Sequence, residues 1–291
     1  MTTSSFDVDG ITLRYHVHGS GPVCVAVPGG PGIAWDYLRS PTLEEHLTMV
    51  YLEPAGTGDS GRLATHPHGY TRELASRHLA ALIDRLAVPR VYLLGHSHGG
   101  FVAQYHAIHH PEQLAGVVLF ESAPATDAEF GAEAARMIGE LAERHAGDPR
   151  LADTLNAFAQ IPTIADDESM MRVARGIIPA YVASYWTDPA PWTELQNVLR
   201  ATYISGLDEH GAPDLIDDRS TLPTLHVPTL VVAGRYDVIC GVRWGEELTK
   251  LIPDSRLLIL ENSGHLGHLE EPELFAESVA AFVADVEAAS E

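Results

Sequence analysis

The sequence has few cysteines and no long apolar segment. Its 291 residues include two cysteines, Cys24 and Cys240, too few for the disulfide framework of a small secreted domain. The first residues lack the basic cluster and the apolar stretch of a secretory signal. No segment approaches the roughly 20 apolar residues that a membrane helix needs. These absences predict a cytoplasmic protein in a reducing compartment.

Basic residues are also scarce. Lys and Arg number 18 against 40 Asp and Glu, which gives a formal net charge of −22. Such a surface repels phosphate backbones and anionic lipids, so neither a nucleic-acid partner nor a membrane partner is expected. The expected partner is a small-molecule or short-peptide substrate, and the sequence leaves the oligomeric state open.

Short apolar segments rich in Val, Leu and Ile alternate with helical patterns along most of the chain. This alternation is typical of a mostly parallel β-sheet with helices on both faces, an α/β fold. Residues 71–87 and 273–288 show the apolar spacing of helices that pack on such a sheet. Asp9-Gly10 predicts a hairpin turn before the first apolar strand. The expected strands span residues 11–18, 23–27, 49–52, 91–94, 117–120, 230–233 and 256–260.

The interval from residue 122 to residue 226 follows a different pattern. It contains no strong buried-strand segment, and prolines, Pro179 among them, interrupt its helical patterns. We therefore expect a helical cap domain of residues 122–226, inserted after the expected strand of residues 117–120. The core domain would then consist of residues 1–121 and 227–291.

The strongest motif is Gly95-His96-Ser97-His98-Gly99, directly after an expected strand and before a helical pattern. This is the context of a nucleophile elbow, in which a strained strand-to-helix turn exposes the serine. Small residues two positions before and after the serine let the chain turn without a Cβ clash. The N-terminus of the following helix favours a developing negative charge there. Ser97 is therefore the predicted nucleophile.

A serine nucleophile needs a histidine base, and the histidine needs a carboxylate that orients it. In folds that carry this elbow, the acid and then the histidine follow late strands. Asp237 and His265 follow the last two expected strands in that order, so they are the predicted acid and base. Two alternatives stay open: His268 could replace His265, and Glu121, at the end of an earlier strand, could replace Asp237.

A glycine-rich segment, Pro28-Gly29-Gly30-Pro31-Gly32, follows the second expected strand. Its backbone N–H groups could point at the reacting carbonyl and form an oxyanion hole. Since proline has no N–H, Gly30 is the expected donor from this segment. The N–H of His98, the residue after the nucleophile, is the expected second donor.

Sixteen histidines raise the question of a metal site. None of their pairs has the His-Glu-x-x-His pattern with a matching third ligand, so no metal is expected. The glycine turns do not form the Gly-x-Gly-x-x-Gly pattern of a dinucleotide site, and no cofactor is expected either.

With these motifs in place, the sequence resembles the α/β-hydrolase superfamily. Residues 28–32 are similar to the His-Gly-Gly-Pro-Gly motif of the proline iminopeptidase group, and residues 234–240, Gly-Arg-Tyr-Asp-Val-Ile-Cys, to its acid-bearing loop. Residues 56–60, Gly-Thr-Gly-Asp-Ser, are similar to a turn found more widely in these hydrolases. The resemblance covers residues 6–121 and 227–288. It implies an α/β-hydrolase fold and a serine hydrolase, most nearly an aminopeptidase that acts on small peptides or amides.

Departures from that group bear on the substrate. Pro28 stands where the group has histidine, and His98 where many of its members have tryptophan. The group is thought to hold the substrate's free amino group with cap glutamates, but the nearest equivalent stretch here has Arg200 in place of the acid, followed by Tyr203. Arg200 therefore favours an alternative, a carboxylesterase or lactonase for a neutral acyl substrate. The expected substrate-binding residues are Trp186, Arg200 and Tyr203.

Two further possibilities remain at this stage. Other acidic residues of the interval could hold an amine in place of the missing glutamate, namely Asp188, Glu194, Asp208 and Glu209. A non-hydrolytic enzyme or a ligand receptor could also use the same scaffold.

Overall fold

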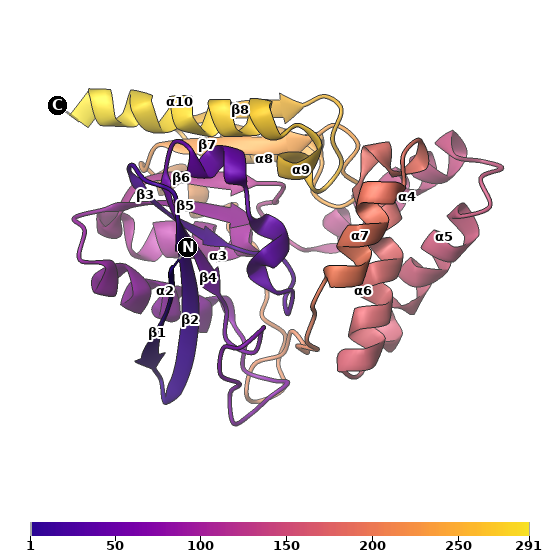
Figure 1. Ribbon diagram of the computed structural model, residues 1–291, viewed down its shortest axis with the longest axis horizontal. Coiled ribbons are helices and arrows are strands. Elements are labelled where there is room, and N and C mark those ends of the chain that lie inside the picture. The colour runs from indigo at the N-terminus through magenta and orange to yellow at the C-terminus, as the bar shows by residue number, and fades with distance from the viewer. Residues whose placement is uncertain (1, 291) are drawn as a thin grey trace.

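The computed structural model describes residues 2–290, so the outermost positions of the expected core, 1 and 291, lie outside the described residues. Strands and helices alternate along most of the chain (Figure 1). The strands are β1 (Thr2–Val8), β2 (Ile11–His18), β3 (Val23–Val27), β4 (Thr48–Glu53), β5 (Val91–His96), β6 (Leu114–Phe120), β7 (Thr229–Gly234) and β8 (Ser255–Leu260). The helices are α1 (Pro41–Glu44), α2 (Arg72–Leu86), α3 (His98–His109), α4 (Ala128–Arg144), α5 (Leu151–Gln160), α6 (Asp167–Tyr181), α7 (Ala190–Val198), α8 (Val242–Leu251), α9 (Gly267–Glu270) and α10 (Pro272–Ser290). The 3₁₀ helices are η1 (Trp35–Leu38), η2 (Pro111–Gln113), η3 (Ile161–Thr163), η4 (Ala183–Trp186) and η5 (Leu222–Thr224). Within the described range, no helix is both long and apolar enough to cross a membrane.

The strands form one sheet, which within residues 2–290 has eight strands in the order β1-β2-β4-β3-β5-β6-β7-β8. β2 pairs antiparallel with β1 and β4, and the remaining pairs are parallel. The mostly parallel sheet and every strand expected from the sequence are thus present. β1 was not predicted, because Phe6 is its only buried residue and no apolar alternation marks it. Asp9 and Gly10 join β1 to β2 at positive φ, as a primed hairpin turn requires.

Side chains of the central strands pack alternately on the two faces of the sheet. On one face, Val25 and Leu93 share a core with Leu79 of α2. On the other face, Leu94 shares a core with Val279 of α10. Each fully buried aliphatic side chain of this kind stabilises the fold by about 1.5–3 kcal/mol. The packed sheet fixes the carboxyl ends of β3, β5, β7 and β8, where the candidate site residues follow.

Helices α4 to α7 follow β6 and stand to one side of the sheet (Figure 1). Ile178 and Trp186 of this helical segment share a core with Val238 and Leu266, which lie in the loops after β7 and β8. Pro179, expected to interrupt a helix, lies instead inside α6, in its last turn, where its missing N–H removes one backbone hydrogen bond. The helical segment is therefore packed directly against the loops that carry Asp237 and His265.

Candidate active site

Ser97 lies at a sharp turn, since β5 ends one residue before it and α3 begins one residue after it. Its φ of 52° and ψ of −117° place it in a region that costs a non-glycine residue about 1–3 kcal/mol. A Cβ at Gly95 would collide with the backbone of Gly99, and a Cβ at Gly99 with the backbone of Val27. Both glycines are therefore required by the close packing of this turn, as the motif predicts.

His265 and Asp237 are hydrogen-bonded to each other, with 2.7 Å between His265 Nδ1 and Asp237 Oδ2. The other Asp237 oxygen accepts hydrogen bonds from the N–H groups of Ile239 at 2.8 Å and Cys240 at 3.0 Å. Asp237 is 0% and His265 3% exposed. Because a carboxylate only accepts hydrogen bonds, Nδ1 carries the proton, and the basic lone pair of the neutral imidazole is on Nε2.

Glu121, the alternative acid, contacts other groups. Its Oε2 lies 3.2 Å from Nε2 of His96, and its Oε1 accepts a hydrogen bond from the N–H of Gly267 at 3.2 Å. Burial, together with the nearby Asp237 carboxylate, raises the pKa of Glu121 well above its usual range. Of the residues that the structure describes, Asp237 alone is hydrogen-bonded to the ring of His265.

His268, the alternative base, is a core side chain. Its Nε2 donates to the carbonyl oxygen of Tyr37 at 2.8 Å. Its ring centroid lies 5.5 Å from that of Phe120 and 6.1 Å from that of Phe275. Burial lowers the pKa of His268 to about 4, so the ring is neutral at neutral pH and supports the loop after β8 by packing.

His96, Glu121 and His265 bring three possible metal-ligand atoms within 4.8 Å of one another. However, His96 Nε2 lies 2.9 Å from the carbonyl oxygen of His265. A nitrogen that approaches a carbonyl oxygen in this way carries a proton and has no lone pair to offer a cation. The geometry therefore fits a hydrogen-bonded cluster rather than a metal site.

The loop after β3 passes beside the nucleophile, since a Cβ added at Gly29 would lie 3.0 Å from the Ser97 Cβ. The N–H of Gly29 donates to the hydroxyl of Tyr37 at 2.6 Å. Gly30 has a φ of 134°, and its N–H forms no hydrogen bond with any described residue. His98 opens α3, so its N–H has no partner within the helix. These two N–H groups are therefore the candidate donors to a substrate oxygen.

A cavity of about 520 Å³ lies over Ser97 and His265. Its volume is within the range of small-molecule sites. None of its described lining residues is Asp, Glu, Lys or Arg, and its polar side chains are serines, tyrosines and histidines. One wall is an apolar stripe of α6, made of Met170, Val173, Ala174, Ile177, Ile178 and Tyr181.

The family model described as alpha/beta hydrolase fold matches residues 22–272 of this chain. The chain belongs to the α/β-hydrolase family. This hydrolase is 26% identical to the proline iminopeptidase PfmaB of Pestalotiopsis fici, over 94% of this chain and 96% of that one. It is 28% identical to a 2-hydroxymuconate semialdehyde hydrolase of Pseudomonas putida, over 94% of this chain and 87% of that one.

Among solved structures, a hydrolase from Pseudomonas aeruginosa PA01 superposes with a TM-score of 0.72 at 26% identity, covering 97% of this chain and 98% of that one. The comparisons thus confirm the α/β-hydrolase fold, the hydrolase class and the resemblance to proline iminopeptidases. Their printed names span several reactions, so the bond that this hydrolase cleaves has to be argued from the site.

Only one of the three expected substrate-binding residues of this hydrolase lines the cavity. Tyr203 lines the cavity, but Trp186 and Arg200 do not. The ring of Trp186 stacks on His145 at 4.4 Å, inside the helical segment. Arg200 is 2.6 Å from Asp36, and both side chains are about half exposed, at 48% and 51%. The expectation for Trp186 and Arg200 is therefore corrected: one fills the core of the helical segment, and the other forms a surface ion pair.

Two lining elements were missed by the sequence reasoning. Tyr37 lies in the short helix η1, where no local pattern marks it. The aliphatic part of the α6 stripe could have been found, because apolar residues recur with helical spacing from Met170 to Ile178. Apolar spacing alone, however, does not tell whether such a stripe faces a cavity or a packed core.

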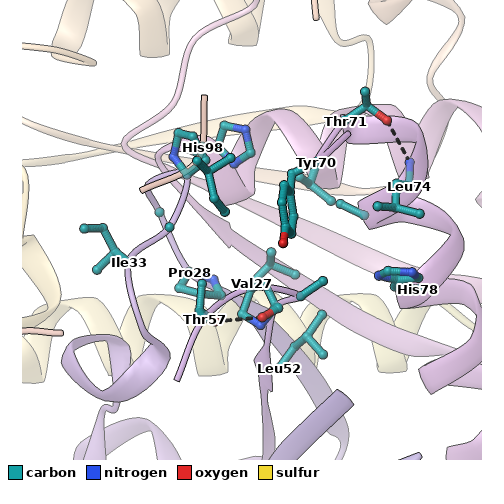
Figure 2. Close-up of a pocket in the computed structure, with 18 of the residues that line it drawn as sticks. Val27, Pro28, Ile33, Leu52, Thr57, Tyr70, Thr71, Leu74, His78 and His98 are labelled. Atoms are coloured by element: carbon teal, nitrogen blue, oxygen red, sulfur yellow. Dashed lines mark hydrogen bonds between the residues drawn. The ribbon is translucent and has the colours of Figure 1, made fainter. Parts of the chain in front are cut away.

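A second, smaller cavity of about 60 Å³ is lined in part by the same loop after β3. Figure 2 shows the ring of His98 on its wall, together with Tyr70, Leu52 and Leu74. Burial lowers the pKa of His98 to about 4, so this ring is neutral at neutral pH. The side chain of His98 lines this small cavity rather than the main one, whereas its backbone N–H belongs to the turn beside Ser97.

Proposed function

We propose that this hydrolase cleaves a neutral ester or lactone with an apolar acyl group, using Ser97 as nucleophile. Ser97 Oγ attacks the carbonyl carbon, while Nε2 of His265 takes its proton and then gives it to the leaving oxygen. Asp237 keeps the imidazole in the Nδ1–H tautomer. The N–H groups of Gly30 and His98 donate to the oxyanion. A water molecule, activated by His265, then hydrolyses the acyl-enzyme.

The state of the Ser97 hydroxyl is compatible with this role. Within residues 2–290, no group is hydrogen-bonded to Ser97 Oγ, and Ser97 and His265 line the same cavity. The hydroxyl is therefore free to turn toward Nε2. Catalytic hydrogen bonds of this kind often tighten only when the substrate is bound.

The observation that carries the choice of substrate is the lack of charged side chains on the described lining of the cavity. Burying an ammonium group without a carboxylate partner costs several kcal/mol, and so does burying a carboxylate without a basic partner. Apolar walls and neutral polar groups instead suit an uncharged acyl chain. The 26% identity to a proline iminopeptidase keeps an aminopeptidase as the second candidate, although this cavity offers its substrate's amine no acidic partner.

We further propose that residues 122–226 act as a cap domain on a core of residues 1–121 and 227–291. Helix α6 supplies one wall of the cavity. The N–H of His265 donates to the carbonyl oxygen of Tyr181 at 2.6 Å, and the N–H of Ser184 donates to Glu270 at 3.0 Å. These contacts connect the proposed cap to the loop that carries the base.

Three esters that share the same leaving group and have acyl chains of similar length test the substrate proposal. We expect kcat/KM for p-nitrophenyl butyrate to exceed that for p-nitrophenyl 4-aminobutyrate, which is cationic, and for p-nitrophenyl hemisuccinate, which is anionic. Each difference should be at least about 100-fold, because an unpaired buried charge is costly. Initial rates of nitrophenol release give these values directly.

Proline p-nitroanilide and its N-acetyl derivative serve as the comparison for the second candidate. A preference for the cationic ester, with cleavage of the free proline anilide that acetylation abolishes, would overturn the neutral-ester proposal in favour of the aminopeptidase.

A further inference from the structure

A chain of three hydrogen bonds runs along one side of the main cavity, from the loop of Gly29 and Gly30 to the loop of His265. Tyr37 and His96, which form this chain, both line the cavity. The N–H of Gly29 is 2.6 Å from the hydroxyl oxygen of Tyr37, and that oxygen is 2.6 Å from Nδ1 of His96. On the other side of the same ring, Nε2 of His96 is 2.9 Å from the carbonyl oxygen of His265. The proposed reaction uses neither the Tyr37 nor the His96 side chain.

One arrangement of protons satisfies every group in this chain. The N–H of Gly29 can only donate, and the carbonyl oxygen of His265 can only accept. Nε2 of His96 therefore carries the ring proton and Nδ1 accepts, so the hydroxyl of Tyr37 donates to Nδ1 and accepts from Gly29. Burial and the neighbouring histidines hold the pKa of His96 well below its usual range, which keeps the ring in this neutral form.

Both connecting residues form further hydrogen bonds. The carbonyl oxygen of Tyr37 accepts a hydrogen bond from His268 at 2.8 Å. Glu121 lies 3.2 Å from His96 and accepts from the N–H of Gly267, two residues after His265. His96 is 2% and Glu121 0% exposed. The His96 end of the chain is thus buried, whereas Tyr37 is half-buried.

We propose that Tyr37 and His96 are positioning residues that hold the oxyanion loop at a fixed distance from the loop of His265. The proposal rests on the proposed function, in which the N–H of Gly30 and Nε2 of His265 act on one carbonyl group. Gly30 directly follows the residue that Tyr37 holds, and His96 binds the backbone of the base itself. A misplacement of 1 Å between such groups can lower a rate by about 100-fold.

The substitution Tyr37→Phe removes the hydroxyl and keeps the ring. We expect kcat for p-nitrophenyl butyrate to fall by about 10- to 100-fold, with KM changed by less than about 3-fold, because alignment and not binding is lost. Tyr92→Phe is the matched control: it removes the hydroxyl of a buried tyrosine on β5, which is bonded to Glu287 at 2.7 Å. Tyr92 is five positions before Ser97 along the chain, or about 16 Å in an extended strand, so its variant should keep the wild-type kcat.

The substitution His96→Leu and the double variant with Tyr37→Phe test whether the two residues act as one unit. We expect kcat of the double variant to lie no more than about 3-fold below kcat of the more damaging single variant. The two losses are not additive because both substitutions break the same chain of contacts. Thermal unfolding of each variant shows whether it is folded. If His96→Leu does not fold, Tyr37→Phe and its control decide the matter.

Equal kcat for Tyr37→Phe and wild type, a loss confined to KM, or an equal loss in Tyr92→Phe would overturn the positioning role. Failure of the proposed function has a different signature. Wild-type protein would then leave the butyrate ester uncleaved, or Ser97→Ala would cleave it as well as wild type does.

Discussion

Replacing Ser97 with alanine is expected to lower kcat/KM for p-nitrophenyl butyrate by about 10⁴- to 10⁶-fold, since no covalent acyl-enzyme can then form. The loss should appear mainly in kcat, because the walls of the cavity and the oxyanion donors remain in place. Alanine also relieves none of the strain at φ 52°, so the melting temperature should change little. Steady-state kinetics and thermal unfolding measure the two effects separately.

Ser76→Ala is the matched control for this substitution. Ser76 is a buried serine on α2 whose hydroxyl lies 3.0 Å from Nδ1 of His106, on a helix that contributes no proposed catalytic group. Its variant should keep the wild-type kcat/KM. A Ser97→Ala variant that retains more than about a tenth of the wild-type activity would show that another nucleophile carries the reaction.

Replacing Asp237 with asparagine is expected to lower kcat by about 10⁴-fold. The carboxyl-like shape is kept, and the amide oxygen can still accept from the N–H groups of Ile239 and Cys240, as Oδ1 does in the structure. The amide nitrogen then faces Nδ1 of His265, where it donates a hydrogen bond. The ring proton is thereby displaced to Nε2, and the base loses the lone pair that Ser97 needs.

Glu121→Gln distinguishes the two candidate acids. Glu121 contacts His96 and the N–H of Gly267, not the ring of His265. The decrease in kcat caused by Glu121→Gln should be at least about 100-fold smaller than the decrease caused by Asp237→Asn, because the tautomer of His265 is unaffected. The reverse order of the two effects would make Glu121 the acid of the site. Rates for both variants at one saturating ester concentration are sufficient for the comparison.

The elements that the sequence predicts well are those with strong local patterns. Buried parallel strands such as β3 and β5 are continuous apolar segments, and the turn at Ser97 needs small residues at fixed positions. β1 has neither kind of signal, since its pairing with β2 comes from the hairpin and not from its own side chains. The expected chain order of serine, acid and histidine selected Ser97, Asp237 and His265. In the structure these residues follow the carboxyl ends of β5, β7 and β8.

The walls of the cavity could not be predicted in the same way. Tyr37 and Tyr203 reach the cavity from short or irregular segments, where no periodicity relates a residue to a face. Arg200 shows the opposite error: its place in the sequence suggested a substrate contact, but Asp36, far away in the chain, binds it at the surface. Which side chains face a cavity is set by such long-range pairs.

The strong negative charge of the chain likewise does not tell which side chains face the cavity. A formal charge of −22 leaves open whether any carboxylate of residues 122–226 could meet a cationic substrate. In the structure, Asp188, Glu194 and Glu209 are exposed, and Asp208 caps the N–H groups of His210 and Ala212 in its own turn. None of the four lines the main cavity. The acidic surface and the uncharged cavity are therefore separate features of this protein.

The reaction of the intact enzyme with a fluorophosphonate, followed by mass spectrometry of its peptides, tests the central claim most directly. A phosphonate traps a serine that is activated by a histidine and stabilised by an oxyanion hole. We predict a single adduct on Ser97 in the wild-type protein and none in Ser97→Ala. A correctly folded wild-type protein without an adduct, or with its adduct on another residue, would contradict the account.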